Sequence, residues 1–185
     1  MREKNDEFWV SIPGGLEYKR RDYKKLIQYL DSSLDKRVKL LLLGNYNRGD
    51  GLAIKKEIED KGLQEYFVFF DSFVEDALFH SYLKSSDCML PLVEENGRYF
   101  NNAISGTFNL AFAHHKVQLL DVSYKETNEF KECALFYEYN DISNYLNSLL
   151  VDRKGLKKAE ESFKNDTRFS FKSQQANYLS LIQCD

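Results

Sequence analysis

Residues 105–107, Ser-Gly-Thr, open a predicted helix directly after a long polar loop. Backbone N–H groups in the first turn of a helix lack intrahelical partners, and the helix dipole adds partial positive charge, so such a start suits an anion. N-capping explains Ser105 equally well, but it does not require Gly106, which costs about 1 kcal/mol of helix propensity relative to Ala. We therefore interpret Ser105, Gly106 and Thr107 as candidate phosphate contacts.

Glycines and cations also occur together in two other predicted loops. Residues 13–23, PGGLEYKRRDY, join two adjacent glycines to two arginines just before a helix, and residues 44–51, GNYNRGDG, hold one arginine among small residues. Adjacent glycines let a ligand approach the backbone, and guanidinium groups bind phosphate in a bidentate manner. The candidates are Gly14, Gly15, Arg20, Arg21 and Arg48. Taken singly, the first loop also reads as a solvated turn and the second as a connector, since neither G-x-G-x-x-G nor a P-loop pattern is present.

Residues 91–107 form the longest polar loop of the sequence and contain Glu95. Loops of this length in α/β domains are usually functional or mobile. Residues 69–76, FFDSFVED, are by contrast expected to form a capping turn whose backbone edge could bond a nucleobase.

The sequence gives little indication of a metal-binding site or of a catalytic nucleophile. The three cysteines are widely spaced without C-x-x-C pairs, and the three histidines have no third ligand at metal spacing. His80 is expected to be structural, while His114 and His115 suit the negative end of a helix dipole. We predict no protein-bound metal and find no catalytic triad.

Composition narrows the class of protein. The chain has 185 residues, 43% hydrophobic residues and a net charge of −3 with both signs interspersed, which predicts one folded domain and no general affinity for nucleic acid. No signal peptide or apolar run of membrane-spanning length is present, so we expect a cytoplasmic protein. Peripheral membrane association through a partner stays open.

Six apolar runs alternate with segments of helical spacing along the whole chain. The runs lie at residues 8–13, 38–44, 66–70, 87–92, 117–121 and 134–139. Nearly continuous apolar character is typical of strands covered on both faces. The pattern predicts a doubly wound, Rossmann-like α/β fold, with a mostly parallel six-stranded sheet, helices on both faces and ligands at the carboxyl ends of the strands.

The order of these pieces resembles the carboxyl-terminal, donor-binding domain of GT-B glycosyltransferases of group 1 (family 4-like), over nearly the whole chain. The stretches that carry the resemblance are VSIPGGLEYKRRDYKKLIQYL, VKLLLLGN, YFVFFDSFVEDALFHSYLKSSDCMLPLVEE, SGTFNLAFAHHKVQLLD and RFSFKSQQANYLSLI. The resemblance implies one domain over residues 1–185, with two terminal helices at about 153–183, that binds a nucleotide-diphosphate sugar. It implies hexosyl transfer in polysaccharide or glycoconjugate synthesis without a cofactor or metal.

By position, the resemblance implies that Gly14, Gly15 and either Arg20 or Arg21 face the diphosphate. It further implies that Glu95 contacts the sugar, and that Gly106 and Thr107 lie beside the phosphates. The amino-terminal acceptor domain of that family is absent from this chain, so a partner domain or separate subunit would supply it and the lone domain is expected to be inactive. In transfer, Arg20 or Arg21 would stabilise the departing diphosphate together with Arg48.

Two alternatives accompany this expectation. The family's second paired glutamate has no match here, which favours a non-catalytic nucleotide-binding or interaction module that keeps the fold. A flavodoxin-like or response-regulator-like domain would need an acidic cluster after the first strand, and residues 11–15, SIPGG, offer none.

Overall fold

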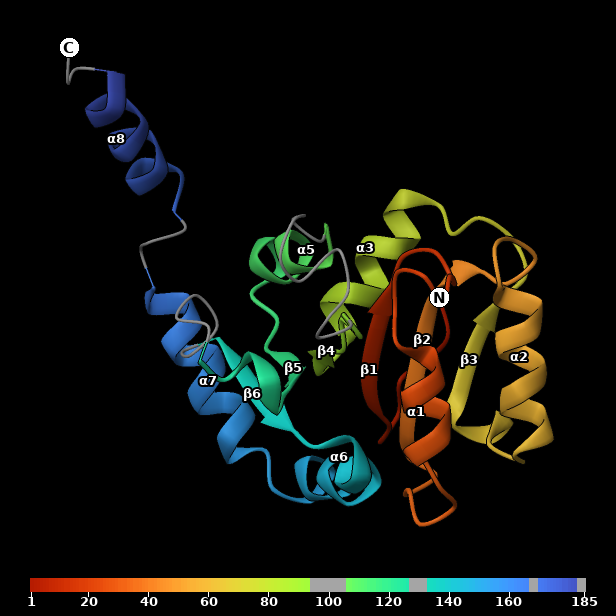
Figure 1. Cartoon of the computed structure of the whole chain (residues 1–185). Helices are drawn as coiled ribbons and strands as arrows, with labels where there is room; N and C mark the ends of the chain where they lie inside the picture. The colour runs from red at the N-terminus through yellow and green to blue at the C-terminus, as the bar shows by residue number, and fades with distance from the viewer. Residues whose placement is uncertain (94–105, 127–132, 167–169, 183–185) are drawn as a thin grey trace.

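The computed structural model describes residues 1–93, 106–126, 133–166 and 170–182. In these residues six parallel strands form one sheet in the order β3-β2-β1-β4-β5-β6 (Figure 1). The strands are β1 (Phe8–Pro13), β2 (Val38–Asn45), β3 (Phe67–Phe70), β4 (Cys88–Met89), β5 (Gln118–Asp121) and β6 (Ala134–Tyr137). The chain builds outward from β1 to β3 and then returns to the other side of β1, which confirms the predicted doubly wound fold.

Helices cover both faces of this sheet (Figure 1). They are α1 (Tyr23–Tyr29), α2 (Gly51–Asp60), α3 (Asp76–Ser85), α5 (Gly106–His114), α6 (Ile142–Val151), α7 (Lys154–Asn165) and α8 (Phe171–Ile182). Short 3₁₀ turns occur at Gln64–Tyr66, Val122–Tyr124 and Tyr139–Asp141. Helices α1, α2 and α6 pack on one face, α3 and α5 pack on the other, and α7 contacts the edge strand β6.

Strand β1 illustrates why the apolar runs are continuous. Phe8, Val10 and Ile12 join the core beneath α1, α2 and α6, whereas Trp9 packs in the core beneath α3 and α5. Successive side chains of a strand point to opposite faces, so a strand with two covered faces needs apolar residues at nearly every position.

Two elements are shorter than the sequence pattern predicts. Helix α1 ends at Tyr29, because the carboxylate of Asp31 accepts the Ser33 N–H at 2.8 Å and forms a turn where the apolar spacing suggested more helix. Strand β4 spans only Cys88–Met89. Pro91 has no N–H for the ladder and Leu92 adopts a φ of 52°, so the chain leaves the sheet early.

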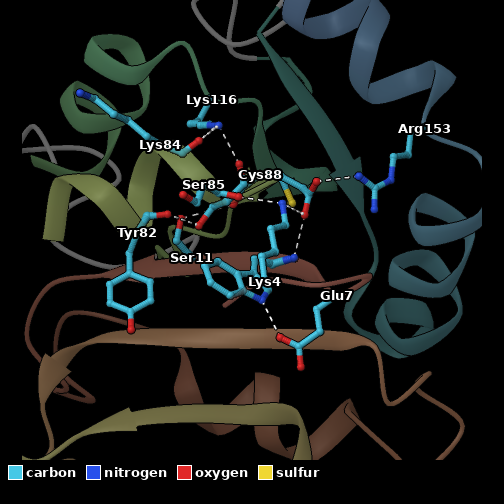
Figure 2. Close-up of polar contacts among 12 residues, drawn as sticks. Lys4, Glu7, Ser11, Tyr82, Lys84, Ser85, Cys88, Lys116 and Arg153 are labelled. Atoms are coloured by element: carbon cyan, nitrogen blue, oxygen red, sulfur yellow. Dashed lines mark hydrogen bonds and ion pairs between the residues drawn. The ribbon is translucent and has the colours of Figure 1, made fainter. Parts of the chain in front are cut away.

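The amino end of β4 is anchored by the carboxylate of Asp87, whose side chain is 11% exposed. Asp87 accepts hydrogen bonds from the Trp9 N–H at 2.8 Å, from Lys4 Nζ at 2.7 Å and from Arg153 Nη1 at 2.8 Å. Figure 2 shows Lys4 and Arg153 reaching this cluster from different elements. The chain start and the α6–α7 connection are thereby fixed to the sheet, at the end opposite to the predicted site.

The last helix, α8, lies away from the sheet (Figure 1). Its Phe171 and Tyr178 side chains are exposed. Across the described parts of the chain, no helix combines the length and the apolar character that crossing a bilayer would take.

Candidate ligand-binding site at the strand ends

A cavity of about 380 Å³ opens at the carboxyl ends of the strands on the β3 side of the switch point. The loops after β1, β2 and β3 and the first residues of α3 line it. We call this the strand-end cavity, and its polar and aromatic lining residues are Glu17, Asn45, Arg48, Phe73, Asp76 and Phe79. Its volume falls in the range of small-molecule sites.

Tight packing of two glycine-containing loops builds the floor of the cavity. A methyl group added at Gly44 would lie 2.6 Å from the Leu16 side chain and would also clash with the Gly14 carbonyl. Gly49 has a φ of 58°, in the left-handed region that favours glycine. The Asp50 N–H donates to the Leu16 carbonyl at 2.9 Å, and the Asp50 carboxylate accepts the Tyr18 N–H at 2.8 Å. The loops after β1 and β2 are therefore fastened together, and the floor is preformed.

Arg21 connects this floor to the switch point. Its guanidinium donates to the Pro91 carbonyl at 2.5 Å, to Thr107 Oγ1 at 2.9 Å and to the Pro13 carbonyl. Gly14 makes room for it, with a φ of 108° and a position where an added methyl group would lie 2.7 Å from Arg21 Nη2. We call this arrangement the Arg21 clamp. It joins the ends of β1 and β4 to the first turn of α5.

The clamp changes the role expected for Thr107. This residue is 3% exposed and its hydroxyl accepts a hydrogen bond from Arg21, so its side chain faces the protein interior. Gly106 differs, because it is exposed and a methyl group added there would meet no atom within 4 Å. Packing with described residues therefore gives no reason for a glycine at this position. α5 begins at Gly106, and the backbone N–H groups of its first turn, which lack partners within the helix, are the groups that an anion at this helix start would contact.

The structure thus brings most of the predicted residues to one edge of the sheet. Gly14, Gly15 and Arg48 line the strand-end cavity, and Gly14 also contacts the Arg21 clamp that reaches Thr107. Arg20 is exposed and is not among the residues that line the cavity. The predictions for Glu95 and Ser105 lie outside the described residues.

Sequence reasoning missed the aromatic wall of the cavity. Phe73, in the loop after β3, is 74% exposed, and Phe79 of α3 is partly buried beside it in the lining. Our sequence analysis assigned this loop to turn formation. The available signal was a phenylalanine inside a polar loop at the carboxyl end of a strand, where ligands of doubly wound folds bind.

Charge in the cavity lining is mixed. Arg48 is exposed and is the one cationic side chain among the described lining residues, where Glu17 and Asp76 contribute carboxylates. The described residues contain no group of three or more His, Cys, Asp or Glu side chains arranged to hold a metal ion. The lining can therefore offer a planar apolar surface, one anion-binding side chain and two carboxylate acceptors to a ligand.

Comparison with known protein families and with curated proteins yields no match to this chain.

Proposed function

We propose that this protein binds a nucleotide-diphosphate sugar in the strand-end cavity and serves as the donor-binding domain of a glycosyltransferase. One observation carries the proposal. A preformed cavity at the carboxyl ends of β1, β2 and β3 combines an exposed aromatic ring, a guanidinium and a glycine-built floor. Nucleotides need a planar apolar contact for the base and cationic or N–H groups for the phosphates.

The aromatic wall suits the nucleobase. Phe73 offers an exposed ring, and stacking of a base on an aromatic side chain contributes about 1–3 kcal/mol. The carboxylate of Asp76 and the amide of Asn45 border the same space and supply polar groups for the base or ribose edge.

The diphosphate would lie between Arg48 and the start of α5. Gly14 and Gly15 line the cavity and permit close approach of the backbone, and the first-turn N–H groups of α5, which starts at Gly106, would bind the phosphates. Because the Thr107 hydroxyl is held by Arg21, the phosphate contacts at α5 come from backbone N–H groups. The guanidinium of Arg21 is bonded to the strand ends, so it would attract the phosphates by its charge without touching them. Arg48 would contact a phosphate directly.

Transfer would need a second domain that holds the acceptor, as the resemblance implies. The departing diphosphate would then be stabilised by Arg48, by the positive charge of Arg21 and by the α5 dipole. The alternative, a module that keeps the fold without transfer, is favoured by one observation, which is that the clamp uses the guanidinium of Arg21 inside the protein.

Calorimetric titration of the full chain with UDP, GDP and their sugar conjugates tests the proposal. We expect saturable binding of one nucleotide class, and Arg48→Ala should weaken it by about 10- to 100-fold, as expected for a charge-assisted hydrogen bond of about 1.5–3 kcal/mol. Arg37→Ala is the matched control. It removes the same charge at the opposite end of β2, where Arg37 is 55% exposed, and should leave affinity unchanged.

Titration with inorganic pyrophosphate tests the phosphate contacts of the site separately from its nucleobase contacts. Phe73→Ala should weaken nucleotide binding by about tenfold or more and leave pyrophosphate binding intact, whereas Arg48→Ala should weaken both. If no nucleotide binds at about 1 mM, the donor-domain proposal is wrong and the interaction module takes its place.

A further inference from the structure

Two histidines from different helices meet on the face of the sheet that α3 and α5 cover. His80 of α3 and His114 of α5 are 34 residues apart in sequence, yet His80 Nδ1 and His114 Nε2 lie 2.8 Å from each other. Their ring centroids are 5.0 Å apart with a tilt of 35°. Both rings thus direct one nitrogen toward the same point.

This contact holds one proton between two nitrogen atoms. A neutral imidazole carries its proton on either ring nitrogen, and which one depends on its partners. If His80 carries its proton on Nε2 and His114 carries its own on Nδ1, both facing nitrogens present a lone pair. That arrangement requires only a change of tautomer, with no proton gained or lost by the pair.

We propose that His80 and His114 chelate a divalent transition-metal ion, such as Zn²⁺ or Ni²⁺, through His80 Nδ1 and His114 Nε2. Two nitrogens that each lie about 2.0–2.1 Å from a tetrahedral zinc ion stand about 3.4 Å apart. The observed 2.8 Å therefore needs to widen by about 0.6 Å, which side-chain rotation on exposed helix surfaces allows. Imidazole is a favoured ligand for zinc, copper and nickel, whereas Mg²⁺ and Ca²⁺ prefer oxygen.

Charges near His80 and His114 both attract and repel a bound cation. His114 is the last residue of α5, where the carboxyl-end carbonyls carry partial negative charge. Lys84 and Lys116 lie close enough to repel a cation, but Lys116 Nζ donates to the carbonyls of Lys84 and Ser86, each at 2.7 Å (Figure 2). With two protein ligands and water in the remaining positions, the site is open and binds more weakly than a closed structural zinc site.

Metal binding would fasten α3 to α5. Helix α3 contributes Asp76 and Phe79 to the strand-end cavity, and the first turn of α5 holds Thr107 of the Arg21 clamp. The ion would therefore hold α3, which lines the cavity, against α5, which carries Thr107 of the Arg21 clamp. The metal site does not depend on nucleotide binding and is tested without any nucleotide.

Titration of the tag-free, chelator-treated full chain with NiCl₂ and ZnCl₂ by calorimetry tests the proposal. We expect one ion per chain, with His80→Gln and His114→Gln each weakening affinity by at least about tenfold, since even outer groups around a metal change affinity by that factor. His115→Gln is the matched control. His115 is the third histidine of the chain, and its ring packs against Phe163 at 5.7 Å.

Imidazole NMR of the wild-type protein gives a second readout that needs no variant. With three histidines in the chain, diamagnetic Zn²⁺ should shift the ring signals of His80 and His114 clearly more than those of His115. The proposal is overturned if nickel binds His80→Gln as tightly as wild type, or if the His80 and His114 signals stay unchanged in the bound protein. It is also overturned if Mg²⁺ binds equally well, or if no saturable binding occurs below about 1 mM metal.

Discussion

Replacing Arg21 with alanine should destabilise the folded chain by about 2–4 kcal/mol. The half-buried guanidinium donates to the Pro13 and Pro91 carbonyls and to the hydroxyl of Thr107, and each hydrogen bond from a charged donor contributes about 1.5–3 kcal/mol net. Water can replace part of the donation to the carbonyls, but the Thr107 side chain is only 3% exposed. The expected loss is therefore smaller than the sum of three bonds and larger than any one of them.

Denaturant unfolding followed by tryptophan fluorescence measures this loss. Trp9 is the single tryptophan, lies fully buried in β1 and reports on the centre of the sheet. For a chain of this length, about 2–4 °C of Tm corresponds to 1 kcal/mol, so the melting temperature should fall by roughly 5–15 °C. Lys19→Ala is the control, because that side chain is 80% exposed and its ion pair with Glu17 contributes about 0–1 kcal/mol.

A double-mutant cycle with Gly14 tests the geometry of the clamp. Gly14→Ala alone places a methyl group 2.7 Å from Arg21 Nη2 and strains a φ of 108°. In the Arg21→Ala background the collision disappears and only the backbone strain remains, so Gly14→Ala should cost less there by about 0.5–3 kcal/mol. Unfolding of Arg21→Ala at the same midpoint as Lys19→Ala would refute the clamp, because the guanidinium would then not be bonded to the strand ends.

Two further predictions concern ionisable groups far from the cavity. Asp87→Ala should lower the free energy of unfolding by about 2–4 kcal/mol in the same denaturant assay, because it leaves the Trp9 N–H, Lys4 and Arg153 without their acceptor; unchanged stability would contradict the anchor. Hydrogen bonds from Arg37 lower the pKa of Asp35 from 3.8 to about 2. The folded pKa is below the unfolded one, so this stabilisation is present above about pH 4 and is lost toward pH 2. Asp35→Asn should remove that part of the acid dependence of the free energy of unfolding, which amounts to less than about 1 kcal/mol given solvent screening, and an unchanged acid profile would contradict it.

The fold could be predicted from sequence because a strand that is covered on both faces needs apolar residues at nearly every position, and such continuous apolar runs are visible in the sequence. Strand β1 has the bounds that its apolar run predicts, since side chains on both its faces are buried. Strand β4 is shorter than its apolar run predicts. Leu90 and Leu92 are buried beyond Met89, and the Leu90 N–H still donates to the Ser11 carbonyl of β1. The strand ends there because Pro91 has no N–H and Leu92 adopts a positive φ.

The candidate site could be predicted only where backbone topology decides position. Gly14 and Arg48 share a cavity because the carboxyl ends of neighbouring parallel strands meet at one edge. The bond between Arg21 and Thr107 joins residues 86 positions apart. It depends on side-chain direction, which a single sequence does not record. The contact between His80 and His114 was missed for the same reason, because spacing rules search for ligands close in sequence.

Arg21 has two separable effects at the switch point, and Arg21→Lys distinguishes them. The planar fork of arginine can reach several acceptors at once, whereas lysine carries a compact charge on a flexible stem. Lysine at this position should therefore keep the positive charge behind the candidate phosphate site while losing much of the clamp. If the clamp only supports the fold, nucleotide affinity should follow stability across Arg21→Lys and Arg21→Ala. If the charge itself attracts phosphate, Arg21→Lys should retain affinity that Arg21→Ala loses, and raising the salt concentration should narrow the difference. A structural clamp and an electrostatic contribution are thus compatible in one residue, because a charge acts on an anion beyond the atoms it is bonded to.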